Sequence, residues 1–278
     1  MKFLSKIIVL CGLSWSGMSA FQINRAEVIP ELIHFVVVIP SYNNSGWVER
    51  NIRSALDQAY KNYSIRYIDD ASLDGTGMLA MQHAAQYADK SISITVNKER
   101  CGALKNIYDA VHACDDRSVI VTLDGDDWFA HSGVLARLNE EYQSGAVWMT
   151  YGQYLKWPYN QMGGSRQVPD EVIAHNTFRY AEWCTSHLRT FYAGLFKKIK
   201  REDLLFNETT FFPAAWDLAF MIPMLEMSGW HSRFIPDILY IYNLTNPISD
   251  YRINVGLTGQ CGAMITQKSP YMPLDRLF

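Results

Sequence analysis

Three carboxylates follow a single apolar run near the middle of the chain, at Asp124, Asp126 and Asp127 in the stretch VTLDGDDWF. Like charges this close repel one another and resist removal from water unless a positive group lies among them. Mg²⁺ and Mn²⁺ prefer carboxylate oxygens and commonly bind one or two carboxylates together with substrate phosphates. We therefore expect Asp124 and Asp126 to hold Mn²⁺ or Mg²⁺ beside a diphosphate.

Two more polar loops end apolar runs: SYNN follows HFVVVIP (34–40), and DASLDGT follows YSIRYID (63–69). Asp, Asn, Ser and Gly dominate ordinary turns, so each loop taken alone is explained as a turn. In an open parallel sheet, however, ligands bind at the carboxyl ends of the strands, where all three loops would meet. The chain has no GxxxxGK[ST] and no GxGxxG after a strand, so a phosphate would need another source of positive charge, such as a metal.

The elements that must position these loops alternate along the first half of the chain. Continuous apolar runs rich in β-branched residues indicate buried strands, and helical spacing of apolar residues separates them. This alternation indicates βαβ units, an α/β fold and a mostly parallel central sheet flanked by helices. We predict strands over 34–40, 63–69, 91–96 and 117–123, and helices over 47–60, 78–88 and 103–113.

After residue 150 the alternation stops. The stretch GAVWMTYGQYL predicts one more strand, and residues 157–182 have a loop-like composition. A helix is expected over 215–229 despite Pro223, followed by a late strand in DILYIYN. The final 35 residues give weak signals, and we expect a loose tail.

Composition limits the class of protein. The 278 residues are 49% hydrophobic and 19% charged, which is typical of a globular chain with one large domain or two small ones. A net charge of −3 gives no basic surface for nucleic acid, so no nucleic-acid partner is expected. Nothing in the composition indicates an oligomeric state.

The N-terminus has the layout of a secretory signal peptide over residues 1–20. Lys2 and Lys6 flank the start of an apolar run, and small residues lead to a cleavage site after Ala20. The run is shorter than the roughly 20 apolar residues of a transmembrane helix. Export to the secretory-pathway lumen, or to the periplasm or outside, is therefore expected, with an uncleaved anchor or a buried N-terminal helix as alternatives.

Four cysteines would remain after cleavage. An even number in an exported chain permits two disulfides with three pairings, and free thiols are an equal alternative. No CxxC pair occurs, which argues against a structural zinc site. The four are Cys101, Cys114, Cys184 and Cys261.

The motifs VVVIPSYNN, ALDQAY, YIDDASLDGT and LDGDD together resemble those of the family 2 glycosyltransferases with the GT-A fold. The resemblance covers about residues 34–150, where five elements occur in family order, and it is looser beyond. It implies a GT-A (Rossmann-like) sheet with a less regular, acceptor-side C-terminal half. It also implies a metal-dependent transferase that moves a sugar from a nucleotide-diphosphate donor, a UDP-sugar, to a hydroxyl of a glycan, lipid or protein.

The resemblance also implies roles for single residues. The loop Ser41–Asn43 packs on the nucleotide, and Asp70 accepts a hydrogen bond from the base. Asp126 is the direct metal ligand and Asp124 lies nearer the ribose, while Asp74 is structural. The implied donor-binding set is Pro40, Ser41, Tyr42, Asn43, Asp70, Arg100, Lys105, Asn106, Asp124, Gly125 and Asp126.

Two departures from the family pattern stand out. Ala71 replaces the family's glycine, which is tolerable unless that residue needs a positive φ. The third segment reads NKERCGALKN instead of the commoner N-x-G form. Arg100 and Lys105 in this segment could approach the diphosphate or could simply be solvated surface residues.

The second half should supply a general base. Inverting relatives use an acidic residue on a helix after the acceptor loop, which corresponds here to Asp217 in PAAWDLAF. The alternative is that Asp217 caps a helix N-terminus. Glu182 and Asp170 are other candidates for the base. His231 and His187 could contact phosphate or sugar, or could be structural.

These inferences divide the chain into a signal peptide (1–20), a nucleotide-sugar-binding half (21–150), an acceptor-binding and catalytic half (151–245) and a C-terminal tail (246–278). A catalytically degenerate carbohydrate-binding protein of the same fold is one alternative, against which the retained DxD argues. Another metal-dependent nucleotide-processing enzyme is the second. A phosphatase motif would follow the first strand and have Thr or Val where Trp128 stands, and a nucleotidyltransferase would need a Gly- and Lys/Arg-rich first loop.

Overall fold

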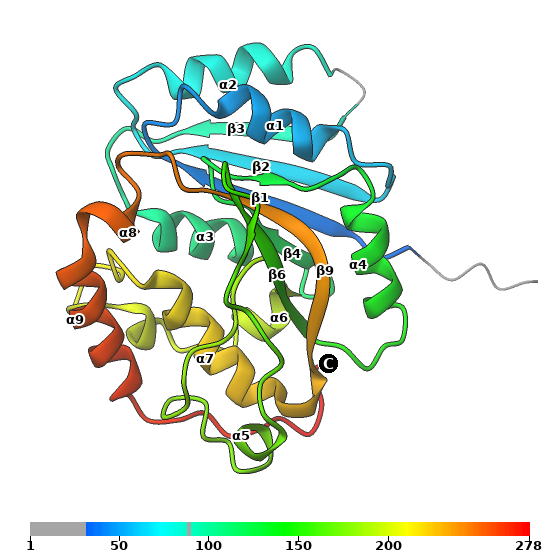
Figure 1. Cartoon of the computed structure of the whole chain (residues 1–278), viewed down its shortest axis with the longest axis vertical. Helices are drawn as coiled ribbons and strands as arrows, with labels where there is room; N and C mark the ends of the chain where they lie inside the picture. Colours follow the sequence, from blue (N-terminus) through cyan, green and yellow to red (C-terminus); the bar gives the residue numbers. More distant parts are fainter. Residues whose placement is uncertain (1–31, 88–89) are drawn as a thin grey trace, which may run out of the picture. The chain divides into compact units, whose positions relative to one another are not determined.

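A computed structural model describes residues 32–87 and 90–278, and its centre is a mixed β-sheet (Figure 1). Within the described residues the sheet has nine strands in the order β3-β2-β1-β4-β8-β6-β9-β5, with β7 paired to β6. Strands β1 (Phe35–Ser41), β2 (Tyr63–Asp69), β3 (Ile92–Val96) and β4 (Val119–Thr122) run parallel. The predicted α/β class and the four parallel strands are confirmed.

Helices cover both faces of the parallel strands, as Figure 1 shows, with α1 and α2 on one side and α3 on the other. Because successive side chains of a strand point to opposite faces, β1 supplies two cores. Val36 and Val38 pack with α3, while Phe35, Val37 and Ile39 pack with α1. The helices are α1 (Val48–Leu56), α2 (Thr76–Ala84) and α3 (Ala103–His112).

The second half extends the sheet with strands of both directions. β8 (Arg189–Tyr192) pairs antiparallel to β4 and to β6 (Met149–Trp157). β9 (Ser232–Asn243) lies parallel to β6 and starts five residues before the predicted late strand. The remaining elements are β5 (Trp128–Phe129) and α4 (Val134–Tyr142), which precede β6, and β7 (Gln161–Met162), α5 (Asp170–Ala174), α6 (Ala193–Phe196), η1 (Arg201–Leu204) and η2 (Gly229–His231), which follow it.

The helix expected over 215–229 is present as α7 (Trp216–Ser228), with Pro223 inside it. A proline in a helix interior costs about 3 kcal/mol because it removes a hydrogen bond and crowds the preceding turn. Every residue of α7 from Ala219 to Ser228 is buried. Tertiary burial therefore outweighs the local penalty.

The expectation of a loose tail is wrong. The chain after β9 forms α8 (Asp250–Ile253) and α9 (Val255–Thr266), which lie at the left of Figure 1, and Cys261 and Ile265 are buried. The buried Arg179–Glu226 ion pair secures this region, because Arg179 donates to the Ile265 carbonyl and Glu226 accepts from the Tyr271 N–H. Glycine-rich α9 has weak helix propensity, so its helical state depends on this packing.

Two sequence expectations concern export. Cys101, Cys114 and Cys184 are free thiols, and Cys101 is exposed whereas Cys114, Cys184 and Cys261 are buried. The signal peptide predicted at 1–20 lies outside the described residues. Among the residues that the structure describes, no helix is long and apolar enough to cross a membrane.

Candidate active site

The loops after β1, β2 and β4 meet at the carboxyl edge of the parallel strands. Ser41 pairs in register with Asp69 at the ends of β1 and β2, and Val38 pairs with Thr122 at the end of β4. Asn43 and Leu73 connect the first two loops, because the Leu73 N–H donates to Asn43 Oδ1 over 3.0 Å. The sequence prediction that three polar loops converge is therefore confirmed.

The DGDD segment, residues 124–127, is a tight turn against the β1 loop. The Asp127 N–H donates to the Asp124 carbonyl over 3.0 Å, and the Gly125 N–H donates to the Pro40 carbonyl over 3.1 Å. A Cβ on Gly125 would lie 2.6 Å from Ser41 Cβ and 2.8 Å from Asn44 Nδ2. Only glycine fits between the two acids at this point. Ser41 itself is buried, and its hydroxyl accepts from Tyr67 and Asn44.

Asp127 attaches this turn to β9. Its carboxylate is fully buried and accepts from the Tyr240 hydroxyl over 2.6 Å and from the Asn243 N–H over 2.7 Å. Burial, followed by the charges of Asp126 and Asp124, raises the pKa of Asp127 well above its usual value. Asp127 therefore serves as an internal anchor.

Asp124 and Asp126 are both half-buried and can be reached from outside. Asp126 Oδ2 accepts from Asn246 Nδ2 over 2.8 Å, and the same amide contacts Asn44 Oδ1 at 3.2 Å. Asn246 thus joins the DGDD turn to the β1 loop from the segment after β9.

A hard divalent cation fits this group of oxygens. Among the described residues, one ligand atom each of Asp124, Asp127 and His187 lie within 4.8 Å of one another. Asp127 already accepts on both oxygens, and His187 is buried beside a cation. Asp124 and Asp126 are half-buried and remain the carboxylates predicted to hold Mn²⁺ or Mg²⁺.

His187 lies behind the DGDD turn. Its ring stacks on Tyr240 at 4.3 Å and on Tyr242 at 5.4 Å. Burial, reinforced by the charge of Arg189, lowers the pKa of His187 well below its usual value, so the ring is neutral. Because an arginine can only donate, His187 Nδ1 accepts from Arg189 Nη1 at 3.2 Å. Because it is buried, His187 has a structural role behind the site.

Asp217 lies in the first turn of α7, after the N-cap residue Ala215, so it does not occupy the cap position. Its Oδ2 accepts from Arg189 Nη2 over 2.7 Å, and its side chain is 21% exposed against 5% for Arg189. A partly exposed carboxylate held by a buried cation suits a proton acceptor.

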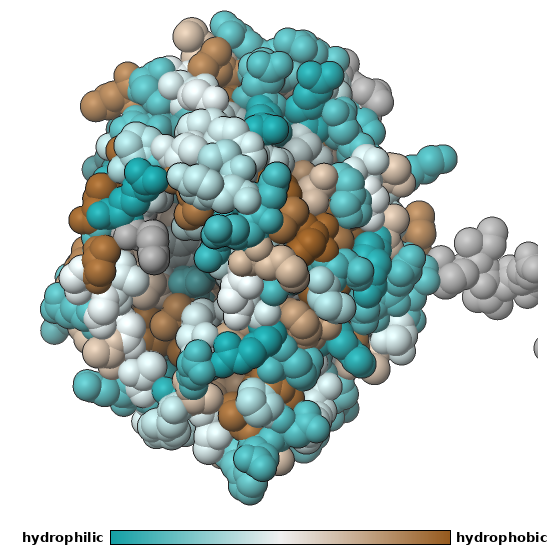
Figure 2. All heavy atoms as spheres, viewed as in Figure 1, coloured by the Kyte–Doolittle hydropathy of each residue, from teal (hydrophilic) through white to brown (hydrophobic). Residues whose placement is uncertain are grey.

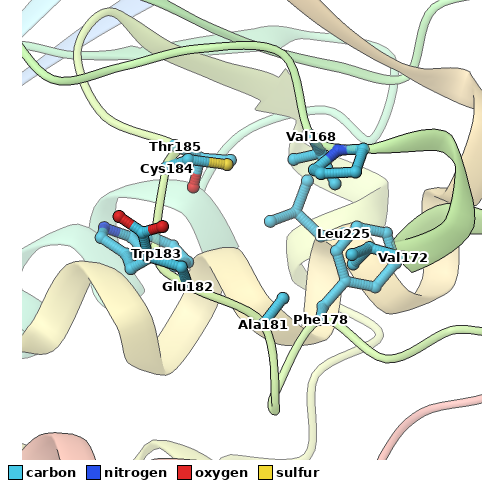
Figure 3. Close-up of a pocket in the computed structure, with 10 residues that line it drawn as sticks. Val168, Val172, Phe178, Ala181, Glu182, Trp183, Cys184, Thr185 and Leu225 are labelled. Atoms are coloured by element: carbon cyan, nitrogen blue, oxygen red, sulfur yellow. The ribbon is translucent and has the colours of Figure 1, made fainter.

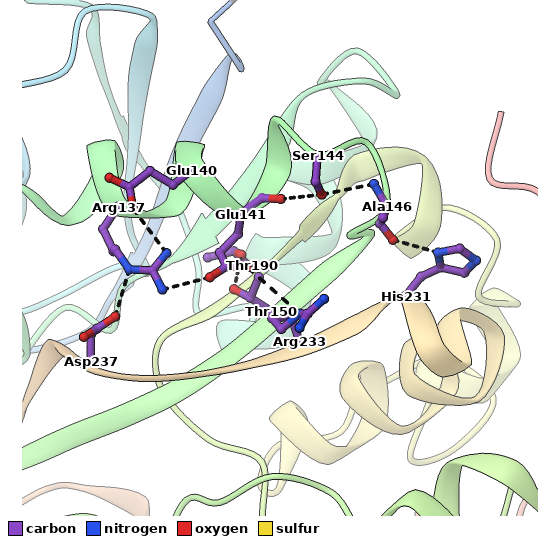
Figure 4. Close-up of polar contacts among 10 residues, drawn as sticks. All are labelled: Arg137, Glu140, Glu141, Ser144, Ala146, Thr150, Thr190, His231, Arg233 and Asp237. Atoms are coloured by element: carbon purple, nitrogen blue, oxygen red, sulfur yellow. Dashed lines mark hydrogen bonds and ion pairs between the residues drawn. The ribbon is translucent and has the colours of Figure 1, made fainter.

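The other candidate bases are less suitable. Glu182 is 79% exposed and forms an ion pair with Arg166, and Asp170 is an exposed residue in the first turn of α5. His231 precedes β9, whereas Asn243 beside the DGDD turn ends it. Figure 4 shows His231 bonded to Ala146, near the polar contacts around Arg137 that join α4 to Asp237 of β9.

Asp70 is buried and accepts three hydrogen bonds from the segment after β3. Oδ1 accepts from Asn97 Nδ2 and the Cys101 N–H, each at 2.9 Å, and Oδ2 accepts from the Gly102 N–H at 2.8 Å. Burial alone would raise the pKa of Asp70, but these hydrogen bonds together bring it below its usual value. Asp70 therefore holds the 97–102 loop, and its predicted contact with a base stays a prediction.

Asp74 makes the structural contacts expected of it. It accepts from the Ser45 N–H at 2.9 Å and from the Thr76 N–H at 3.1 Å. In the same loop Ala71 has φ 60°, in the left-handed region that favours glycine. Ala71, which replaces the family's glycine, therefore adopts a positive φ, and the replacement is unfavourable.

The remaining predicted donor residues lie on two sides of this edge. The Arg100 guanidinium lies 3.8 Å over the Tyr42 ring. Lys105 forms an ion pair with Asp109 on its own helix, and Asn106 is buried and accepts from Asn97 Nδ2 over 2.8 Å. The Arg100 side chain thus lies over Tyr42 of the loop after β1, while Lys105 and Asn106 make their contacts within the fold.

Several site residues had not been predicted. Asn51 on α1 donates to the carbonyls of Asp124 and Asp127 at 2.9 and 2.7 Å. Asn243 ends β9 and Asn246 lies in the polar stretch that follows it, the same signal that marked the first three loops. Arg189 had no such signal, because it begins a strand that the sequence did not predict.

The face viewed in Figure 2 is hollowed beside the position of α8. A separate pocket lies between the 168–185 segment and α7 (Figure 3), and its lining includes neither the DGDD carboxylates nor Asp217. This pocket is mainly apolar, with lining side chains that include Val168, Val172, Phe178, Trp183 and Leu225.

Comparisons with known proteins give a consistent result. The model of Glycosyl transferase family 2 matches residues 36–202. EpsE of Bacillus subtilis is 39% identical over 93 residues, which is 33% of this chain and 32% of EpsE. TuaG of the same organism is 32% identical over 91 residues, or 33% of this chain and 35% of TuaG. Both carry the word glycosyltransferase in their names, and each match spans only about a third of the relative.

Solved structures share the fold at low identity. S. aureus TarS 1-349 superposes with a TM-score of 0.56 at 16% identity, covering 76% of this chain and 60% of that one. TarS has also been solved with UDP-GlcNAc. The mannosyltransferase PcManGT from Pyrobaculum calidifontis, solved with GDP-Man and Mn²⁺, gives 0.54 at 19% identity over 76% of this chain and 57% of its own.

Proposed function

The chain belongs to glycosyl transferase family 2, and on that premise we propose that it moves a sugar from a nucleotide-diphosphate donor, a UDP-sugar, to an acceptor hydroxyl. One observation carries the proposal: the accessible carboxylates Asp124 and Asp126 stand where the loops after β1 and β2 converge. TarS with UDP-GlcNAc and PcManGT with GDP-Man and Mn²⁺ support a nucleotide-sugar donor and a divalent ion.

Asp124 and Asp126 would hold Mn²⁺ or Mg²⁺, whose charge, when bound, makes the diphosphate a better leaving group. Asp127 keeps the two acids in place through β9. Gly125 lets the turn approach the β1 loop closely enough for both to face one donor. Tyr42, with Arg100 across its ring, offers an aromatic surface to the nucleotide.

In the proposed reaction an acceptor oxygen attacks the anomeric carbon. The bond from that carbon to the diphosphate oxygen breaks, and its electron pair leaves on the nucleoside diphosphate. Asp217 takes the proton of the acceptor hydroxyl. The transition state has oxocarbenium character, and a single displacement inverts the anomeric centre.

The acceptor is a hydroxyl of a glycan, a lipid or a protein, and it gives its proton to Asp217. Export guided by residues 1–20 remains part of the proposal. The rival function, a degenerate carbohydrate-binding protein, predicts binding without turnover.

The test is a donor screen on purified protein. Release of UDP or GDP from a panel of nucleotide sugars is followed with Mn²⁺ and acceptor glycans, with and without EDTA. We expect turnover that EDTA abolishes and that Asp126→Ala lowers at least about 100-fold, with the inverted anomer as product. Glycan binding without release from any donor would support the rival function, and activity insensitive to EDTA would overturn the metal assignment.

A further inference from the structure

Arg189 is placed beside the acidic turn by the strand that it begins. In the antiparallel pair β4–β8, Arg189 pairs with Thr122, two residues before Asp124. The Thr122 hydroxyl also donates to the Arg189 carbonyl over 3.3 Å. Arg189 therefore lies beside the carboxyl end of β4, although it comes 67 residues after Thr122 in the chain.

The guanidinium of Arg189 connects two parts of the site. Nη2 donates to Asp217 Oδ2 over 2.7 Å, and Nη1 donates to His187 Nδ1 over 3.2 Å. Burial lowers the pKa of Arg189, but the nearby charges, that of Asp217 first and then those of Asp124, Tyr240 and Tyr242, together raise it above its usual value. The cation is thus paired directly with the proposed base.

Stability alone explains this arrangement poorly. Removing two charges from water costs free energy that their attraction often fails to repay, and apolar pairs of similar volume are commonly as stable. The Arg189 Nε is buried and makes no hydrogen bond within the described part of the chain. The more deeply buried pair, Arg179 and Glu226, has a clear structural task, because it connects α7 to the C-terminal region.

The pairing instead suits a proton acceptor. Because Arg189 contacts Oδ2, it restrains the carboxylate, and in the proposed reaction Oδ1 is the oxygen that takes the proton. Arg189 itself is too buried to touch a substrate, and the neutral His187 ring fills the space behind it between Tyr240 and Tyr242. The Trp216 ring lies 5.7 Å from the guanidinium carbon on the other side.

We propose that Arg189 is a positioning residue that orients Asp217 for proton abstraction from the acceptor. This inference rests on the proposed function, because it takes Asp217 as the base. It predicts that Arg189 acts on the rate of transfer through Asp217, while donor binding at Asp124 and Asp126 depends on it little.

The test is a double-mutant cycle of Arg189→Met and Asp217→Asn, with kcat, the KM for donor and the affinity for UDP with Mn²⁺ measured for each variant. We expect Arg189→Met to lower kcat about 100-fold while the UDP affinity changes by less than about threefold. Asp217→Asn should lower kcat further, and adding Arg189→Met to it should have no additional effect. Arg189→Lys should recover about tenfold, because it restores the charge without the forked geometry.

Arg66→Met is the matched control. Arg66 also lies on a strand, β2, and its guanidinium donates to the carbonyls of Ala110 and Ala113, away from the acidic residues of the site. It should lower stability without lowering kcat. Additive effects of Arg189→Met and Asp217→Asn, or an equal loss of UDP affinity, would overturn the positioning role. Full transfer by Asp217→Asn would remove the base and this inference with it. Absence of transfer by the wild type from every donor would overturn the proposed function as well.

Discussion

The Nδ2 amide of Asn246 lies 2.8 Å from Oδ2 of Asp126, across 120 positions of sequence. The same amide contacts Asn44 at 3.2 Å, so one buried side chain holds the acidic turn against the β1 loop. A neutral donor on one oxygen orients a carboxylate without competing for its charge. Asn246 is therefore expected to set the geometry in which Asp126 meets a cation.

Asn246→Ala should weaken Mn²⁺ binding about 10- to 100-fold in the presence of UDP, the usual cost of losing a partner that orients a ligand. Titration calorimetry with Mn²⁺ at saturating UDP measures this directly. Asn207→Ala is the control, because Asn207 caps its own exposed turn through Thr209 and Thr210. An unchanged Mn²⁺ affinity in Asn246→Ala would contradict the orienting role.

Substitution of the neighbouring acids Asp127 and Asp126 should have different effects, on stability in the first case and on activity in the second. Asp127→Ala leaves the Tyr240 hydroxyl and the Asn243 N–H buried without their acceptor, which we expect to lower the free energy of unfolding by about 2–4 kcal/mol. Asp126→Ala, at a half-buried position, should change it by less than about 1 kcal/mol while abolishing metal-dependent turnover. Urea unfolding of both variants measures these free energies of unfolding, and equal destabilisation would refute the assignment of Asp127 as the anchor.

Ala71→Gly should stabilise the protein. A non-glycine residue in the left-handed region costs about 1–2 kcal/mol of stability. Glycine removes that cost but increases the entropy of the unfolded chain, which lowers the free energy of unfolding by about 0.4–1 kcal/mol. The net expectation is a gain of about 0.5–1 kcal/mol in the free energy of unfolding. Ala113→Gly, at a φ of −86°, should instead lower it. A loss in both variants would show that Ala71 is not strained.

Stability should also depend on pH through His187. Because the pKa of His187 is lower in the folded protein than its usual value of 6.5, the unfolded chain binds its proton more readily below that pH. Stability should therefore fall as the pH drops below about 6.5, by at most about 1.4 kcal/mol per pH unit from this group. In His187→Phe, which keeps the stacking, the slope of unfolding free energy against pH should be shallower by that amount. Identical slopes would mean that His187 is not held neutral.

The sequence predicted well those parts of the fold that local pattern determines. Val36 and Val38 alternate with Val37 and Ile39 because both faces of β1 are buried, so the apolar run is continuous and unmistakable. The acidic turn was equally visible, because three carboxylates at the end of a buried strand need an explanation. For the same reason Asp124, Asp126 and Gly125 could be selected before the structure was known.

The parts that were missed depend on distant contacts. α9 lacks charged residues and contains several glycines, so its helix is visible only through the burial of Cys261 and Ile265. Arg189 could not be selected, because its importance comes from the β4–β8 register. Ser41 and Asn106 are buried, and their expected contact with a donor stays a prediction, since a motif gives a residue's position and not the direction of its side chain.

The anchoring of Asp127 has a consequence for how the chain matures on the ribosome. Its two hydrogen-bond partners are synthesised 113 and 116 residues later, so the acidic turn cannot be completed while the nascent chain ends before β9. Until then a carboxylate intended for the interior must stay hydrated, which holds the end of β4 open. We expect the segment that carries β1 to β4 to leave the ribosome early. It should reach its final fold only when β9 has left the exit tunnel.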